Sequence, residues 1–438
     1  MADDDAKLGV FSTFSVGIGG MVGGGIFAVT GLTIETTRAA APLAFVVAGI
    51  VALLTSYSYL RLTLAFPGEG GTVDFLNRAF GGGILTGAAN ILLLLSYVVL
   101  LSVYAYAFGS YGANLLPPAQ QELWVHVLTS GIVVALLGLN ILAPRLVIES
   151  ENLLNAIKLL ILGGLVVAGF LLPMDWSQLD PVGAVSPVGL VAGAMLIFLN
   201  YEGFELIANA SPDVADPRRA LPVAYLGGVV VVILLYALIV AVVLGHLSLA
   251  QVRAASDTAL SAAGQAILGR AGYLAIVVAA LLATGSAINA TLFSTGRLAY
   301  VVAKTGELPA SLEGTIRGTH GEGAIICAVL AIVIANVVPL DAIATMGSAG
   351  FLLLFFLVNL ANVRLARQTG SRAWLSALAA LATLGALVVL CVSVEENPAS
   401  RNHLWIFAGL IGVSLVIEIV YRGLTGRRIT LHRRRRRT

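Results

Sequence analysis

The 438-residue chain has little charge, few cysteines and few histidines. Only 11% of its residues are charged and 58% are hydrophobic, which is too apolar a balance for an ordinary soluble domain. Cys327 and Cys391 each stand alone in an apolar stretch, so no disulfide framework or thiolate metal site is expected. The five histidines show no paired spacing, and no glycine-rich phosphate loop is present. These absences argue against metal or redox chemistry and against an ATPase.

What the chain does contain is a series of apolar runs. A helix that crosses a bilayer needs about 20 mostly apolar residues, and twelve such windows can be placed. They cover residues 9–33, 41–66, 84–113, 123–143, 150–172, 188–209, 222–245, 271–302, 323–339, 341–364, 373–393 and 403–421. The sequence therefore predicts an all-α integral membrane protein with 12 transmembrane helices in a single transport domain, 1–438.

The distribution of Lys and Arg predicts how the chain is oriented. With the amino terminus inside, 19 of the 25 basic residues fall in inner segments, four fall in outer segments, and Lys158 and Arg297 lie within spans. Basic residues favour the cytoplasmic side. We therefore expect a multi-pass plasma-membrane protein with both termini in the cytoplasm. The basic tail at 422–438, with its run Arg433 to Arg437, is expected to contact anionic lipid rather than nucleic acid.

Two of the predicted spans are interrupted, about 180 residues apart. The first break is Gly-Gly-Met-Val-Gly-Gly-Gly-Ile-Phe at 19–27, and the second is Phe-Leu-Asn-Tyr-Glu-Gly-Phe-Glu at 198–205. In a bilayer, unwound backbone is tolerated only where it lines a cavity or is buried in protein. Glycines spaced in this way also serve close helix packing, which is the alternative for the first break taken alone. Breaks at corresponding positions of two halves indicate a transporter site near the membrane midplane.

The two breaks predict complementary ligand groups. A half-helix that begins near Gly24 or Gly25 presents unpaired amides and the positive end of its dipole, which suit a carboxylate. The second break frees carbonyl oxygens for an ammonium group, and Glu202 and Glu205 add two carboxyls at membrane depth. Such carboxyls usually face a cavity or a partner. The alternative for both acids is an interhelical hydrogen bond made by the protonated form.

Together with four further motifs, these breaks resemble the amino acid/polyamine/organocation permease superfamily. The further motifs lie at 67–81, 216–222, 286–290 and 304–309. The resemblance implies a LeuT-type 5+5 inverted repeat with discontinuous helices 1 and 6, in which 9–172 and 188–365 are the repeats and 373–421 holds two appended helices. It also implies a substrate carboxylate on Gly23, Gly24 and Gly25, and an ammonium on the carbonyls of Met21, Leu199 and Glu202.

Lys158 is the residue that bears on energy coupling. It is the only lysine inside a predicted span, where it is costly unless it meets carbonyls or loses its proton. In proton-coupled relatives a lysine on this helix resembles a stand-in for a sodium ion between spans one, five and eight, whereas the alternative is snorkelling to the inner surface. The resemblance suggests that Glu205 is a gate or proton-sensing carboxyl. Further cavity candidates are Tyr97, Tyr104, Phe204, Ser286 and Asn289.

The sequence thus predicts a permease that imports amino acids with protons by alternating access. It predicts no cofactor and no metal. Three alternatives remain open at this point: an exchanger or a carrier of amines or polyamines, a membrane-embedded enzyme that uses the intramembrane acids and lysine, and a non-transporting sensor.

Overall fold

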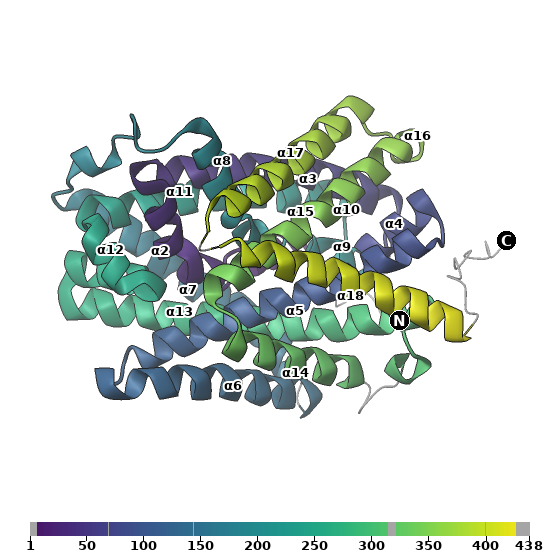
Figure 1. Ribbon diagram of the computed structural model, residues 1–438, viewed down its shortest axis with the longest axis horizontal. Helices are drawn as coiled ribbons and strands as arrows, with labels where there is room; N and C mark the ends of the chain where they lie inside the picture. The colour runs from purple at the N-terminus through teal and green to yellow at the C-terminus, as the bar shows by residue number, and fades with distance from the viewer. Residues whose placement is uncertain (1–6, 69, 143, 314–320, 399, 426–438) are drawn as a thin grey trace.

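The protein is a bundle of helices (Figure 1). The computed structural model describes residues 7–68, 70–142, 144–313, 321–398 and 400–425, and within these ranges it contains no β-strand longer than the isolated Leu8–Val214 bridge. The α-helices are α1 Val10–Met21, α2 Gly25–Thr37, α3 Ala41–Ala65, α4 Thr72–Phe80, α5 Ile84–Ala113, α6 Pro118–Leu142, α7 Pro144–Leu171, α8 Pro187–Leu196, α9 Leu206–Ala210, α10 Pro217–Pro222, α11 Gly228–His246, α12 Leu249–Ala255, α13 Ala259–Lys304, α14 Gly321–Val337, α15 Leu340–Arg364, α16 Ala366–Thr369, α17 Ala373–Glu396 and α18 Asn402–Thr425.

The helices are long and apolar enough for a multi-pass membrane protein. Over the described ranges, nine helical stretches meet this criterion, or ten if α8 and the bent segment Phe198–Asp213 are counted as one span. One stretch, Gly25–Ala65, has 41 residues, which as one helix would be about 62 Å long, twice the hydrocarbon thickness. Arg38, with φ 50°, interrupts it between α2 and α3. The total of twelve spans and the division into two repeats stay predictions.

Helix α5 forms the centre of the bundle. It packs against α6, α13, α14, α15 and α18, and 83% of its most apolar window is buried. Figure 1 shows α5 and α13 running lengthwise side by side, and α18 packs on α5. Of the broken helices, α2 packs on α5 and α13, and α8 packs on α2, α3 and α15. The residues of both breaks, 21–25 and 198–205, are buried.

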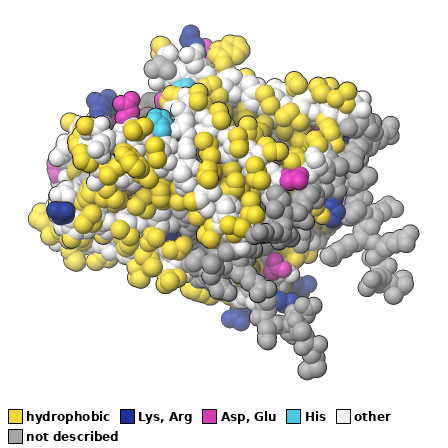
Figure 2. Space-filling view, turned by 90° about the horizontal axis from the view of Figure 1, so that it is seen from below, with side chains coloured by type: hydrophobic (Ala, Val, Ile, Leu, Met, Phe, Trp, Pro, Cys, Tyr) yellow, Lys and Arg dark blue, Asp and Glu magenta, His cyan; other side chains and the backbone are white. Residues whose placement is uncertain are grey.

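The outer surface is apolar, as lipid contact requires. Figure 2 shows hydrophobic side chains spread over the face seen from below, with few charges among them. Large side chains on α6 are more than half exposed, including Leu123 and Val134. In water such a continuous apolar surface would drive association. In a bilayer it matches the acyl chains.

Basic residues gather at one end of the bundle. Figure 1 shows α4, α16 and the last turns of α18 at the same end, which we call the α4 end. Side-chain contacts connect these segments: Arg61 donates to the carbonyl of Thr369, and Arg422 donates to that of Gly82. Arg78, Arg364, Arg367 and Arg372 also belong to segments of this end. All six arginines belong to the segments that the sequence predicts to be cytoplasmic.

Candidate functional site

The first break is a buried helix start without a side-chain cap. Helix α1 ends at Met21 and α2 begins at Gly25, and all residues from Met21 to Gly25 are buried. Gly24 occupies the N-cap position of α2, and no side chain accepts a hydrogen bond there. The first amides of a helix have no intrahelical acceptor. The structure therefore places an uncapped helix start where the sequence predicts a carboxylate.

Glycine is required here because other side chains press on the backbone. A Cβ atom on Gly24 would lie 2.7 Å from Cδ1 of Tyr104 and 2.9 Å from Cγ2 of Thr284. A Cβ on Gly25 would overlap the amide oxygen of Asn200. Tyr104 thus covers the first break, and Asn200 brings the second break to it. Gly23 is confined in the same way, by Ala287 and Tyr104.

The two breaks touch through their backbones. A Cβ on Gly20 would lie 2.9 Å from the carbonyl oxygen of Gly203. Gly203 itself has φ 119°, a conformation that L side chains rarely adopt, and it separates the 3-10 turn Phe198–Tyr201 from α9. Segments 183 residues apart in sequence therefore lie against each other, and the site predicted between them stays a prediction.

A tyrosine that the sequence analysis did not single out connects the breaks. The hydroxyl of Tyr236, on α11, donates to the carbonyl oxygen of Met21 at 2.7 Å and lies 3.4 Å from that of Asn200. The Leu199 carbonyl accepts the amide of Glu202 at 3.2 Å. Two of the three carbonyls predicted for the ammonium thus already have a donor, although each keeps a second lone pair. The sequence signal that could have identified Tyr236 is its position as a lone tyrosine in the apolar run 228–246.

The two acids of the second break lie in different surroundings. Glu205 is fully partnered: one carboxylate oxygen accepts the amide of Gly203 at 2.7 Å, and the other accepts the hydroxyl of Tyr97 at 3.0 Å. Glu202 is completely buried, and neither of its carboxyl oxygens has a hydrogen-bond partner among the described residues. The amide group of Asn200 is likewise unpartnered there. Buried polar groups without partners are costly unless a ligand or water satisfies them.

Lys158 reaches the end of the first half-helix. Its ammonium is completely buried and donates to the carbonyl oxygen of Gly19 at 3.2 Å. Nearly one helical turn earlier on α7, the amide of Asn155 lies 3.3 Å from the hydroxyl of Ser15 on α1. Helix α7 also packs along α13. A completely buried ammonium does not fit snorkelling to the surface.

The remaining candidates divide between the site and its supporting structure. The Ser286 hydroxyl is buried and has no partner among the described residues, as expected of a cavity group. Asn289 accepts a hydrogen bond from Asn140 at 2.6 Å, which joins α13 to α6. Phe204 packs in an aromatic cluster that also contains Tyr59, Phe75, Phe198, Phe351 and Phe355. The roles predicted for these residues in the cavity stay predictions.

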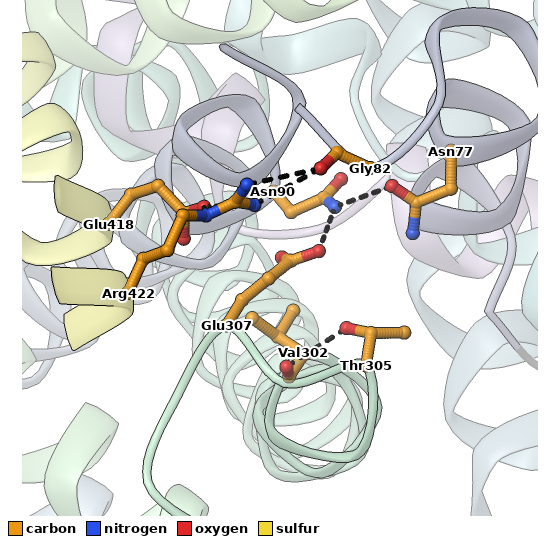
Figure 3. Close-up of polar contacts among 8 residues, drawn as sticks. All are labelled: Asn77, Gly82, Asn90, Val302, Thr305, Glu307, Glu418 and Arg422. Atoms are coloured by element: carbon orange, nitrogen blue, oxygen red, sulfur yellow. Dashed lines mark hydrogen bonds and ion pairs between the residues drawn. The ribbon is translucent and has the colours of Figure 1, made fainter. Parts of the chain in front are cut away.

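A second buried polar cluster lies at the α4 end (Figure 3). The carboxyl of Glu307, just past the end of α13, accepts a hydrogen bond from Asn90 at 2.9 Å, and Asn90 also donates to Asn77 at 3.3 Å. The second oxygen of Glu307 has no partner among the described residues. Burial raises the pKa of Glu307 from 4.5 to about 8, and nearby Glu418 adds to this effect. The cluster joins α13, α4 and α5.

We expect the Glu307→Gln variant to lose part of the pH dependence of stability. Between about pH 4.5 and pH 8 the folded protein holds a proton on Glu307 that the unfolded chain has released. Stability therefore falls as pH rises through this window, by on the order of a few kcal/mol in total. A glutamine still accepts from Asn90 but has no proton to lose. Thermal unfolding in detergent at pH 5 and pH 9 should show a smaller difference for this variant than for the wild type, with the exposed Glu396→Gln as control; equal differences would contradict the burial argument.

These features together define a class of protein. A multi-pass helical bundle in which two broken helices meet, with unpaired polar groups beside the breaks, has the architecture of a secondary transporter. Residues 8–416 match the model of the family described as Amino acid permease, and the chain belongs to this family. The resemblance to the amino acid/polyamine/organocation superfamily is thereby confirmed.

Curated relatives of similar length agree with this assignment. The chain is 33% identical to the inner membrane transport protein YbaT of Escherichia coli over 424 residues, covering 94% of this chain and 96% of that protein. It is 31% identical to an uncharacterised protein of Methanocaldococcus jannaschii, covering 96% of each chain. A methylthioribose transporter of Bacillus subtilis is 26% identical over 82% of this chain and 81% of its own length. The chain is a membrane transporter of amino acids or related organic substrates, and not an enzyme.

Proposed function

We propose that this permease imports an amino acid across the plasma membrane together with a proton, by alternating access, with both termini in the cytoplasm. The observation that carries the proposal is the contact between the two breaks. One break is the buried start of α2, where Gly24 is the N-cap without a side-chain partner, and the other, which touches it at Gly20 and Gly203, carries the backbone carbonyls of Leu199 and Glu202. A zwitterion, whose carboxylate and ammonium are attached to the same carbon atom, fits donors and acceptors that lie this close together.

In this proposal the main chain recognises the part common to all amino acids. The amides of Gly23, Gly24 and Gly25 receive the carboxylate, because they stand at the positive end of α2. The ammonium lies against the carbonyls of Met21, Leu199 and Glu202. Ser286 is a candidate for contact with the amino acid side chain.

Lys158 would couple the proton to movement of the first half-helix. While protonated, its ammonium holds the carbonyl of Gly19 and so ties α1 to α7. Loss of the proton removes the charge from this contact and allows α1 to move. A proton can drive accumulation only if it binds with different affinity in the two conformations. The contact between Lys158 and α1 would supply this difference in proton affinity, because it would be made in one conformation and broken in the other.

A second candidate function is transport or exchange of an amine or polyamine. The completely buried, unpartnered carboxyl of Glu202 favours it, because a second ammonium would pair with this group. Uptake by purified protein in liposomes, with labelled amino acids, amines and methylthioribose competing, distinguishes the candidates. We expect neutral amino acids to compete. Competition by amines alone would support the second candidate and contradict the first.

The two acids should respond differently to the loss of charge. Glu202→Gln is expected to change substrate affinity or choice, because its carboxyl has no partner among the described residues and is available to a ligand. Glu205→Gln should instead shift the pH dependence of transport, because this carboxyl joins the second break to Tyr97. Uptake kinetics measured from pH 5 to pH 8 test both. If both variants behave as the wild type, the acids serve only the structure.

A further inference from the structure

An apolar groove opens near the α4 end, away from the helix breaks. It has a volume of about 590 Å³ and lies between α4, α5, α15 and α18. Its walls are almost wholly aliphatic or aromatic, as Phe80, Leu92, Leu357 and Leu415 illustrate. Leu85, on its rim, is 80% exposed. The volume falls within the range of ligand sites, roughly 300–1,000 Å³.

An arginine lies beside this groove, on the side that faces the α4 end of the bundle. On α15 the lining residues Leu353 and Leu357 are followed by Arg364, seven positions after Leu357 and therefore on the same helix face. Arg364 is exposed, and its guanidinium carbon lies 6.0 Å from the ring centre of Phe80, which lines the groove. No carboxylate of the described residues forms an ion pair with it.

A second arginine near the groove is already neutralised. Arg422, on α18, pairs with Glu418 at 2.7 Å and donates to the carbonyl of Gly82 at 3.2 Å (Figure 3). A Cβ on Gly87 would overlap the Glu418 carboxyl, so α18 approaches α5 closely here. These contacts hold two walls of the groove together. Arg364, in contrast, is exposed and available to an anion at the end of the groove.

We propose that the groove binds an anionic phospholipid, with an acyl chain along α5 and the headgroup phosphate on Arg364. The groove belongs to the apolar surface of a membrane protein, so its natural occupant is a hydrocarbon chain. The cation at one end selects an anionic headgroup, as basic pockets between transmembrane helices do. A free phosphate would leave the apolar walls uncovered. This site is separate from the predicted lipid contact of Arg433 to Arg437, which lies outside the described residues.

The test is a lipid titration of the purified full-length protein followed by native mass spectrometry. Phosphatidylglycerol is the probe, and phosphatidylcholine is the comparison lipid. Arg364→Gln should weaken phosphatidylglycerol binding about fivefold, because one basic residue near a membrane surface contributes about that factor. The matched control is Arg372→Gln, since Arg372 is exposed at the same end but precedes α17, which packs on α15 and α3. It should change binding less than about twofold.

A second variant fills the groove without altering charge. Ala88→Phe places a ring among the lining residues and should displace the lipid even with Arg364 intact. The proposal is overturned if phosphatidylcholine binds as tightly as phosphatidylglycerol, or if Arg364→Gln and Arg372→Gln behave alike. It is also overturned if Ala88→Phe leaves lipid binding unchanged. If Ala88→Phe instead splits a dimer, the groove is covered by a second copy of the chain, which overturns the proposal as well.

Discussion

The Lys158→Ala variant is expected to lose proton-driven accumulation completely. In liposomes with an inward proton gradient, the wild type should concentrate its substrate, whereas the variant should bring it only to equal concentrations on both sides. The reason is that alanine offers neither a mobile proton nor a charge for the carbonyl of Gly19, which Lys158 contacts at 3.2 Å. Replacing sodium with potassium or choline should leave wild-type uptake unchanged.

Controls separate coupling from stability in this experiment. Removal of a completely buried side chain also leaves a cavity, so the thermal unfolding of the variant must be measured. Lys304→Ala is the matched substitution, because Lys304 is exposed at the end of α13 and packs over Tyr300. It should accumulate substrate as the wild type does. Undiminished accumulation by Lys158→Ala would remove Lys158 from the mechanism without affecting the family assignment.

The second large effect is expected at the first break. Gly24→Val should remove measurable uptake, because its side chain would press on Tyr104 and Thr284 and occupy the space above the amides. A hydrogen bond to a charged group contributes roughly 1.5–3 kcal/mol, so losing even one lowers affinity by about ten- to a hundredfold. Binding of labelled substrate to purified protein measures this loss directly.

A glycine elsewhere in the bundle provides the comparison. A Cβ atom on Gly163, in α7, would have no heavy atom within 4 Å, so Gly163→Val should insert, bind and transport normally. Equal transport by Gly24→Val and Gly163→Val at matched expression would contradict the carboxylate assignment. Loss of folding in Gly24→Val alone would be seen as a lower unfolding temperature, and Gly24→Ala, which adds only the Cβ atom beside Tyr104 and Thr284, then serves as the smaller change.

The breaks could be predicted from sequence because their cause is local. Glycine clusters and carboxyls are rare inside apolar spans, so Gly23 to Gly25 and Glu202 stand out without any knowledge of packing. Lys158 stands out for the same reason, and its contact with α1 agrees with the resemblance. The family and the helical membrane architecture followed from these features and are confirmed.

The contacts made by other helices could not be predicted in this way. An apolar helix with no polar face gives no signal for its rotation, so nothing pointed Tyr236 of α11 at the carbonyl of Met21. The sequence predicts Asn289 only as a cavity candidate, and it gives no signal for the hydrogen bond that this side chain accepts from Asn140 across the α6–α13 contact. The partnered Glu205 and the unpartnered Glu202 also look alike in sequence, because their difference depends on Tyr97, 108 residues before Glu205.

The central claim, that this permease moves a proton with its amino acid, is tested most directly by measuring both fluxes in one preparation. Purified protein is placed in liposomes that contain a pH-sensitive dye, in sodium-free buffer, and a labelled amino acid identified by the competition panel is added outside. The account predicts that uptake acidifies the interior, and that neither uptake nor acidification occurs with Gly24→Val. Uptake with no change in internal pH, or uptake that requires sodium, would contradict it.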